Sequence, residues 1–404
     1  MAPAPTILIA GGGIGGLALA LALARRGRDA LVLEQRDRFA TAGAGIQLGP
    51  NGVRALEGLG VAPALAGLIG APMSLAVHAG RTGRVLATLP LGAWITARHG
   101  APYWVAHRGD LHQALLSAAS AEPRITLRTG FALTAPVVVG GGVEVASSAG
   151  EVVGGSALVG ADGLWSCVRQ SLWPTSAPVF VGATATRAVI PAAAAGRLAG
   201  SRVGLWLTPA VHVVHYPVRG GAEIAVVVIA AEHWPEREWD VAADAASLRA
   251  RLTGFHPSLT EVLATVRDWR KWGLFCLARL NAWSRGRVTL MGDAAHPMLP
   301  YLAQGGALAL EDALVLAACV AEYPGEEERA FRSFEALRRN RAERVQRASR
   351  RQGRIYHLPP PLSWGRDLLL HALPGERLMA GLDWLYGWRG ATNACSPASR
   401  VPRH

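Results

Sequence analysis

Hydrophobic residues cluster in three short runs within the first 34 residues of the chain. Residues 6–10 (TILIA) are apolar, residues 11–16 (GGGIGG) are nearly all glycine, and residues 17–24 are uniformly apolar. A further apolar run, residues 30–33, ends on Glu34. Short apolar runs bounded by glycine are typical of buried strands, and the longer run suits a buried helix. The pattern predicts a strand, a glycine turn, a helix and a second strand.

The rest of the chain alternates strand-like and helical patterns. Residues 125–159 hold short β-prone runs separated by glycine turns, which predict a small antiparallel meander. Residues 73–106 and 177–280 hold further strand-like pieces, many rich in Val and Ile. Residues 287–293 read as a strand followed by a turn, and residues 305–321 as a long helix. A second, sheet-based domain is therefore expected inside the first.

These elements predict an α/β fold: a Rossmann-like nucleotide-binding domain with a β-meander, interleaved with a mixed or antiparallel β-sheet domain and followed by C-terminal helices. A helix is expected to begin near Arg108, with Asp110 as its N-cap. The expected boundaries are residues 1–72, 107–176 and 281–355 for the first domain, 73–106 and 177–280 for the second, and 356–404 for a helical segment.

The glycine turn carries a nucleotide-binding pattern. Gly11, Gly13 and Gly16 fit G-x-G-x-x-G, in which the glycines make the tight turn, admit a pyrophosphate and let helix and strand pack closely. Glu34 follows Gly11 by 23 residues, where a carboxylate binds a ribose diol and repels a 2′-phosphate. The turn, including Ile14 and Gly15, is therefore predicted to bind FAD or NAD; the alternative is a tight βα turn without a ligand.

Composition and charge exclude some classes of partner. The net charge is +12, and ten arginines lie between residues 329 and 354, which raises the question of nucleic-acid binding. Forty arginines stand against one lysine, and apolar residues recur in this stretch at helical spacing, so an amphipathic surface helix with a solvated basic face is preferred. We expect no nucleic-acid partner.

Two further patterns concern membranes and metals. Residues 3–24 lack charge and are long enough to span a bilayer, but five glycines and the absence of a basic leader argue against a span or a signal peptide. The four cysteines are far apart and no Cys/His cluster occurs, so no metal is expected. A cytoplasmic protein without a membrane partner is predicted.

Three strand-to-turn motifs, at Gly11, at Asp162-Gly163 and at Gly292-Asp293, would meet at the carboxyl ends of one sheet, where ligands bind. In order and spacing they resemble the class A flavoprotein monooxygenases, which share the para-hydroxybenzoate hydroxylase fold, as far as at least Ala313. The resemblance implies a noncovalently bound FAD. A second G-x-G-x-x-G is missing, so a separate nicotinamide domain is not expected, and NAD(P)H would bind transiently. The FAD contacts it implies are the glycine turn, Glu34, Gln35, Arg36, Arg108, Asp162, Gly163, Gly292, Asp293, Gln304, Gly305 and Gly306.

Within this family, residues 44–51, 215–221 and 300–304 look most like the salicylate and 6-hydroxynicotinate hydroxylase group. The resemblance implies hydroxylation of a small phenolic or N-heteroaromatic acid with O2, through a flavin C4a-hydroperoxide. The 6-hydroxynicotinate hydroxylases carry histidine at the positions of Gln47 and Tyr301, so this chain departs from them there.

A phenolate attacks an electrophilic oxygen far better than a phenol, so a base near the substrate is expected. His215 is the preferred candidate because a histidine pKa lies near working pH, with Tyr216, Tyr301 and Gln47 as orienting or relaying groups. A structural role for His215 and Tyr216 within a strand is the alternative. Three arginines are candidate carboxylate anchors, although a surface position is preferred for each: Arg187, Arg202 and Arg219.

Two other functions stay open at this point. One is a related monooxygenase for a larger polyketide, quinolone or antibiotic scaffold. The other is a non-catalytic flavin or dinucleotide sensor. The sequence does not determine the aromatic ring, the position hydroxylated, the choice between NADH and NADPH, or whether the protein is a homodimer.

Overall fold

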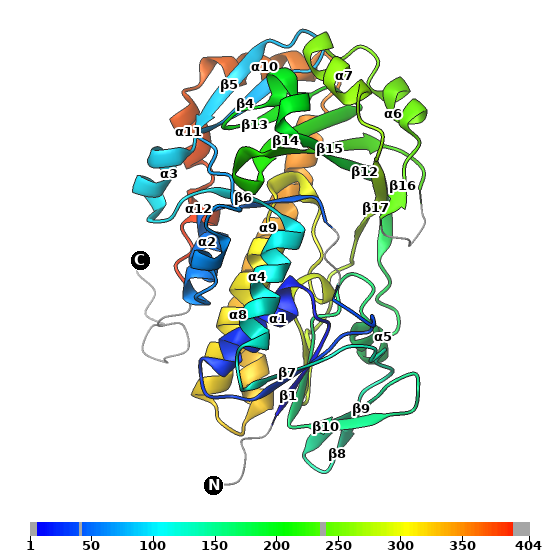
Figure 1. Cartoon of the computed structure of the whole chain (residues 1–404). Coiled ribbons are helices and arrows are strands. Elements are labelled where there is room, and N and C mark those ends of the chain that lie inside the picture. The colour runs from blue at the N-terminus through cyan, green and yellow to red at the C-terminus, as the bar shows by residue number, and fades with distance from the viewer. Residues whose placement is uncertain (1–5, 40–42, 235–239, 391–404) are drawn as a thin grey trace.

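The computed structural model describes residues 6–39, 43–234 and 240–390 (Figure 1). The predicted N-terminal unit is present: strand β1 (Ile7–Ala10), helix α1 (Ile14–Ala24) and strand β2 (Ala30–Leu33), with β1 and β2 parallel. They lie in a six-stranded sheet of order β18-β19-β11-β1-β2-β7, parallel except for β18. The other strands are β7 (Ile125–Arg128), β11 (Ala157–Gly160), β18 (Ser284–Arg285) and β19 (Val288–Leu290).

The second sheet lies above the first in Figure 1 and has eight strands in the order β16-β17-β12-β15-β14-β13-β4-β5. Its pairs are antiparallel except β13 with β4, so the sheet is mixed. The strands are β4 (Ser74–Ala79), β5 (Val85–Pro90), β12 (Val179–Pro191), β13 (Arg202–Leu207), β14 (Val211–Val218), β15 (Glu223–Ala231), β16 (Val241–Ala242) and β17 (Arg270–Cys276). The predicted α/β fold class is confirmed.

Smaller strands complete the β-structure. The predicted meander is present as β8 (Val137–Val139), β9 (Gly142–Ala146) and β10 (Val152–Gly155). An antiparallel pair, β3 (Gly45–Leu48) and β6 (Trp104–His107), lies between the two large sheets.

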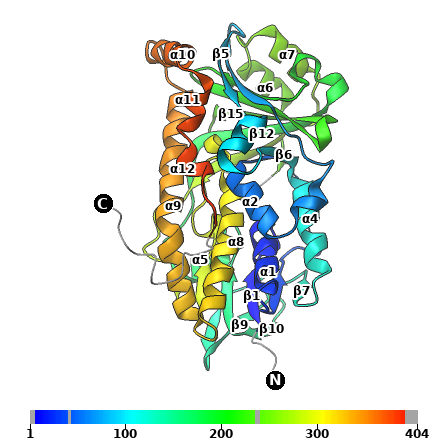
Figure 2. The same ribbon diagram turned by 90° about the vertical axis from the view of Figure 1, so that its left-hand side faces the viewer.

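Helices pack around both sheets. Helix α1 packs against α4 (Arg108–Ser120) and α8 (Gly305–Glu322), while α6 (Ala245–Arg251) and α7 (Pro257–Ala264) lie by the upper sheet. Figure 2 shows the long helix α9 (Glu327–Tyr356) running beside α8 from the lower part of the molecule to the upper sheet. The remaining helices are α2 (Pro50–Gly58), α3 (Gly92–His99), α5 (Cys167–Leu172), α10 (Leu362–Ala372), α11 (Gly375–Ala380) and α12 (Asp383–Tyr386). The end of the predicted C-terminal segment, residues 391–404, lies outside the described residues.

The prediction that Asp110 caps helix α4 was wrong. Helix α4 is capped by His107, whose Nδ1 accepts a hydrogen bond from the Gly109 N–H at 3.2 Å. Asp110 instead lies in the first turn, where its carboxylate favours the positive end of the helix dipole and pairs with Arg219 at 3.2 Å. The strand-like pieces expected within residues 73–106 are present as β4 and β5, and helix α3 lies between β5 and β6.

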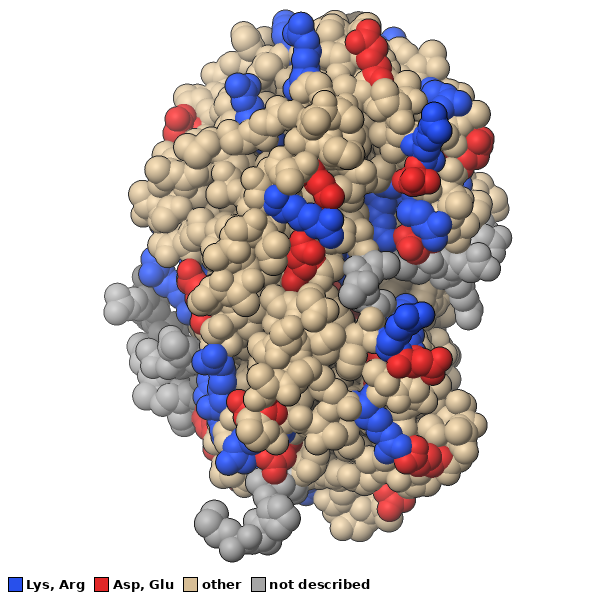
Figure 3. Space-filling model, viewed as in Figure 1, with Lys and Arg blue, Asp and Glu red and all other residues tan. Residues whose placement is uncertain are grey.

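The charged surface is mixed rather than uniformly basic on the face seen in Figure 1. Figure 3 shows basic and acidic side chains interspersed there. None of the helices within residues 6–39, 43–234 and 240–390 combines the length and hydropathy needed to cross a membrane. Over the same ranges, no group of His, Cys, Asp or Glu side chains could hold a metal ion.

Candidate active site

The glycine turn has the geometry of a dinucleotide-binding turn. Gly11 has a φ of 102°, and a Cβ there would lie 2.6 Å from the Ala161 carbonyl oxygen, so the turn requires glycine. A Cβ at Gly16 would lie 1.9 Å from the Gly11 oxygen, whereas one at Gly13 would meet no atom within 4 Å. Gly13 is the N-cap of α1 and provides no side-chain cap. Within the described residues, the N–H groups of Gly13, Ile14 and Gly15 have no hydrogen-bond partner, so they are open to a pyrophosphate.

Glu34 lies at the end of β2 with a fixed carboxylate. Its Oε2 accepts a hydrogen bond from the Gly12 N–H at 3.0 Å, and its Oε1 accepts one from the Arg36 N–H at 3.1 Å. The side chain is buried, while Gln35 and Arg36 beside it are exposed. The carboxylate is thus held next to the glycine turn, where a ribose diol would bind.

Asp162 follows β11 and has one unsatisfied oxygen. Its Oδ2 accepts hydrogen bonds from the Val168 N–H at 3.2 Å and the Cys167 thiol at 3.3 Å. Its Oδ1 is buried and has no partner within the part of the chain that the structure describes. Buried polar atoms are nearly always hydrogen-bonded, so an orphaned oxygen beside Gly163 in the glycine-turn region fits a polar ligand.

Two more charged groups lie close together in this region. Asp293, in the turn after β19, is accessible to solvent, yet the surrounding protein raises its pKa while His296 and Arg108 oppose the rise. Burial lowers the pKa of Arg108, and the nearby charge of Arg187 lowers it further. A ligand such as FAD would supply partners for both residues, because its phosphates can pair with Arg108 and its hydroxyl groups can donate hydrogen bonds to Asp293.

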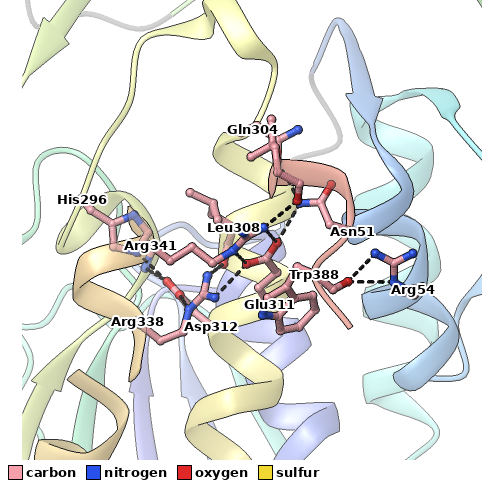
Figure 4. A network of polar contacts seen from close by, with 12 residues as sticks. Asn51, Arg54, His296, Gln304, Leu308, Glu311, Asp312, Arg338, Arg341 and Trp388 are labelled. Carbon is pink, nitrogen blue, oxygen red and sulfur yellow. Dashed lines mark hydrogen bonds and ion pairs between the residues drawn. The ribbon is translucent and has the colours of Figure 1, made fainter. Parts of the chain in front are cut away.

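The N-terminus of α8 is anchored by a buried polar network (Figure 4). The Asn51 side-chain N–H₂ donates to Gln304 Oε1 at 2.8 Å and to Glu311 Oε1 at 2.7 Å. Gln304 is the N-cap of α8, but its side chain does not cap the helix. Among the residues that the structure describes, the first N–H groups of the helix, from Gly305 and Gly306, have no hydrogen-bond partner. Free N–H groups and the helix dipole would stabilise negative charge on a flavin ring.

The same network reaches the Gly292-Asp293 turn. Asp312 Oδ2 accepts from the Gly292 N–H at 3.0 Å and lies 2.6 Å from His296 Nε2. Arg338 of α9 is 1% exposed and binds Asp312 Oδ1 at 2.6 Å and Glu311 Oε2 at 2.8 Å. The expectation of a solvated basic face on this helix is therefore wrong for Arg338, which neutralises two buried carboxylates.

Sequence reasoning missed this network. A signal was present, because Glu311 and Asp312 interrupt an apolar helix and buried carboxylates require partners. Their partners Asn51 and Arg338 come from distant parts of the chain, and no local pattern indicated them.

The upper sheet turns one face toward the part of the molecule that holds the six-stranded sheet. On β14, His212, Val214 and Tyr216 alternate onto this face. His212 contacts the ring of Tyr301 at 5.6 Å between centroids, and Tyr216 packs against Gly45 of β3. Around them lie apolar residues of the neighbouring strands: Ala185, Val227, Ile229, Trp272 and Leu274.

His215 points away from this face, which corrects the prediction that placed it with the substrate. Its ring packs against Gly204 and lies near the backbone of Leu198, and the nearby His78 lowers its pKa. Burial lowers its pKa to about 4. The structure does not bring His215 together with Tyr216 or Tyr301, because successive residues of a strand project to opposite faces.

The other predicted residues form two groups. Gln47 accepts a hydrogen bond from the Tyr103 hydroxyl at 2.7 Å and shares a hydrogen bond with Tyr216. Tyr301 instead contacts His212, which precedes Tyr216 by four residues on β14. Tyr103 was not singled out from the sequence.

Of the three candidate anchors, Arg187 lies on the same face of the upper sheet as His212 and Tyr216. It pairs with Val227 across β12 and β15, in the same row as Val214. Its side chain is 6% exposed, so the expected surface placement was wrong, and it binds Asp240 at 2.6 Å. With His107 and Ala44 it lines a cleft of about 350 Å³.

The fold and these groups together define a flavin-binding protein with a buried aromatic and cationic surface beside the flavin region. The FAD binding domain family model matches residues 5–349. The chain is 35% identical over 384 residues to 3-hydroxybenzoate 6-hydroxylase of Polaromonas naphthalenivorans, covering 95% of this chain and 96% of that protein. It is 34% identical over 354 residues to 6-hydroxynicotinate 3-monooxygenase of Pseudomonas fluorescens, covering 86% and 91%.

Solved structures agree. Klebsiella pneumoniae HpxO complexed with FAD and uric acid has a TM-score of 0.84 at 25% identity, covering 94% of this chain and 96% of that one. A salicylate hydroxylase substrate complex has a TM-score of 0.81 at 22% identity, covering 96% of each, and supports the fold. The chain belongs to the class A flavoprotein hydroxylases, and it is an FAD-dependent aromatic monooxygenase that consumes NAD(P)H. The predicted family, enzyme class and cofactors are confirmed, in preference to a larger-scaffold enzyme or a sensor.

Proposed function

We propose that this hydroxylase acts on a small aromatic acid with a ring hydroxyl, of the hydroxybenzoate type. The observation that carries the proposal is the face of the upper sheet, where His212, Tyr216 and Arg187 stand among apolar side chains. The relatives named for 3-hydroxybenzoate and 6-hydroxynicotinate both act on compounds of this kind. Gln47 and Tyr301 depart from the pyridine-acid pattern, which favours the benzoate series.

In this proposal the predicted cofactor residues hold FAD as their positions suggest. The glycine turn would bind the pyrophosphate, Glu34 the adenosine ribose, and Asp293 the ribityl hydroxyls. The free N–H groups at the start of α8 would face the ring. Bound FAD, reduced by NAD(P)H, would activate O2, which provides the oxygen atom for hydroxylation.

Arg187 is proposed to hold the substrate carboxylate. Its guanidinium is buried near Tyr216, whose pKa it lowers against the stronger effect of burial. A buried charge pair with a carboxylate is favourable only with good geometry. Asp240, which binds Arg187, is 26% exposed, so this carboxylate can turn to solvent when the substrate carboxylate takes its place.

His212 replaces His215 as the proposed general base. It is 2% exposed, and burial holds its pKa well below the ordinary value, so its ring is neutral and can accept a proton at neutral pH. Burial raises the pKa of both Tyr216 and Tyr301. Both tyrosines therefore stay protonated and can donate hydrogen bonds that orient the substrate.

The test is NAD(P)H consumption by the FAD-loaded enzyme across a panel of hydroxybenzoates and hydroxypyridine carboxylates, with mass-spectrometric detection of product and a peroxide assay. The proposal expects a large stimulation by one hydroxybenzoate with about one hydroxylated product per NAD(P)H. Stimulation confined to larger scaffolds, or peroxide as the sole product, would contradict it.

Two finer points belong to the same proposal. A cytoplasmic location is supported by the described cysteines Cys167 and Cys276, which are thiols; Cys395 lies outside the described residues. A homodimer is consistent with the fold, and sedimentation velocity would determine the oligomeric state.

A further inference from the structure

Two histidines from distant parts of the chain share a direct hydrogen bond. His212 Nδ1 lies 2.9 Å from Nε2 of His357, which is the C-cap of α9. The pair is separated by 145 residues in sequence. Two tyrosine rings pack around it, Tyr301 at 5.6 Å and Tyr356 at 5.2 Å from His212 between centroids. The C-terminal part of the chain thus reaches the proposed substrate surface through His357.

We propose that His357 is a positioning residue that holds His212 in its base tautomer and relays to solvent the proton that His212 takes from the substrate hydroxyl. This inference rests on the proposed function, in which His212 is the base. It extends that function by a second residue and a proton path.

The hydrogen bond constrains the tautomers of both rings. If His212 is to accept a proton at Nε2, its own proton must be at Nδ1, and Nδ1–H then donates to the lone pair of His357 Nε2. When Nε2 of His212 accepts the substrate proton, Nδ1 releases its proton to His357 Nε2. His357 becomes briefly cationic and gives its Nδ1 proton to water. One proton leaves the substrate and one reaches solvent, with no electron transfer.

The difference in burial between the two rings gives the path a direction. His212 is 2% exposed, whereas His357 is only half-buried. A cationic ring is less stable in the more buried position, because it loses more of its hydration. Passing the proton to His357 therefore keeps His212 from remaining cationic. Burial lowers the pKa of His357, and the charge of Arg366 lowers it further. A proton that arrives at His357 is therefore passed on to water.

The groups that face the pair are accounted for. On α9, Tyr356 has a pKa raised to about 12 by burial, with Gln352 as a hydrogen-bond partner. From α10, Arg366 donates to the Tyr356 carbonyl oxygen at 2.6 Å and pairs with Asp367 at 2.7 Å. Tyr301 also stays protonated. The two imidazoles are therefore the groups at this position with a ring nitrogen that can accept a proton.

The sharpest test compares His357→Gln with His357→Phe in the FAD-loaded enzyme. A glutamine side chain can still accept the hydrogen bond from His212 but cannot carry a proton, whereas phenylalanine does neither. The control is His371→Gln on α10, because His371 is exposed. The measurements are product formation, the pH profile of kcat/KM, and the rate of proton release after substrate is mixed with enzyme in weak buffer with a pH indicator.

We expect both His357 variants to slow proton release and to lower kcat by about tenfold or more, within the range for general acid–base groups. The acid limb of the pH profile should move to higher pH. His371→Gln should match the wild type in every measurement, and FAD content should be unchanged in all three variants.

The outcomes separate the relay from the proposed function. Wild-type proton release and pH profile in His357→Gln would overturn the relay and leave only the holding of His212. Full hydroxylation by a His212→Asn variant would overturn the base assignment, and the relay with it. Loss of FAD or of thermal stability in His357→Gln, with kcat per bound FAD unchanged, would show a purely structural role and also overturn the relay.

Discussion

Arg338 is the residue whose removal tests the buried network most directly. Arg338→Met removes a guanidinium that binds Asp312 at 2.6 Å, Glu311 at 2.8 Å and the Leu308 carbonyl oxygen at 3.5 Å. Breaking a buried ion pair by removing one partner costs about 3–5 kcal/mol. We expect the lower end, about 3 kcal/mol, because Asp312 keeps His296 and Glu311 keeps another arginine of α9.

That free energy converts to a melting temperature. Unfolding entropy is about 2.1 cal/mol/K per residue, which gives about 0.85 kcal/mol/K for 404 residues. A loss of about 3 kcal/mol should therefore lower Tm by about 4 °C. The assay is thermal unfolding of the FAD-loaded enzyme, followed by far-UV circular dichroism and by flavin fluorescence.

The matched control is Arg332→Met on the same helix. Arg332 is 69% exposed and lies 3.8 Å from Glu328, and exposed pairs contribute below about 1 kcal/mol. Its Tm should fall by about 1 °C or less. Adding Asp312→Asn to Arg338→Met removes one of the two carboxylates that Arg338 neutralises, so the double variant should lose less than the sum of the singles. Equal Tm values for the Arg338 and Arg332 variants would refute the reasoning.

Four further predictions follow from the site. The pKa of Asp312 is held at about 2 by His296 and Arg338. This pKa is below the ordinary aspartate value of about 3.9. Asp312 therefore stabilises the fold at pH values above about 3.9, and this stabilisation is lost as the pH falls toward 2. Measuring Tm at decreasing pH in the wild type and in Asp312→Asn checks this. His212→Asn should lower kcat by at least about 100-fold while FAD stays bound. His215→Asn should keep the wild-type kcat per bound FAD, because His215 points to the opposite face of the sheet. A large loss of kcat in His215→Asn and none in His212→Asn would favour His215 as the base. Arg187→Met should raise KM for a carboxylate substrate by about 10-fold to 100-fold and leave the KM for the corresponding amide little changed, as steady-state kinetics would show. Gly13→Ala should fold normally, because its Cβ meets no protein atom within 4 Å, yet bind FAD weakly by fluorescence titration.

Local patterns predicted most of the fold because the elements concerned carry local signals. The glycine turn requires glycine at positions 11 and 16 for steric reasons, and α8 is apolar along nearly its whole length. The choice between His212 and His215 had no such signal. Strand β14 is buried on both faces, so its alternation of side chains does not show which face turns toward the flavin. Only the packing of β14 against β3 and α9 determines that.

The buried network explains why a helix far along the chain belongs to the flavin site. Adjacent residues of α8, Glu311 and Asp312, hold two separate segments of the proposed flavin site, the first through Asn51 and Gln304 and the second through the Gly292 N–H. Both carboxylates are fully buried, so they require the arginines of α9 as partners. Folding therefore fixes these segments before FAD binds, and their ordering entropy need not be lost on binding. The arginine-rich helix, which looked like a nucleic-acid signal, supplies the charge that makes this preorganisation stable.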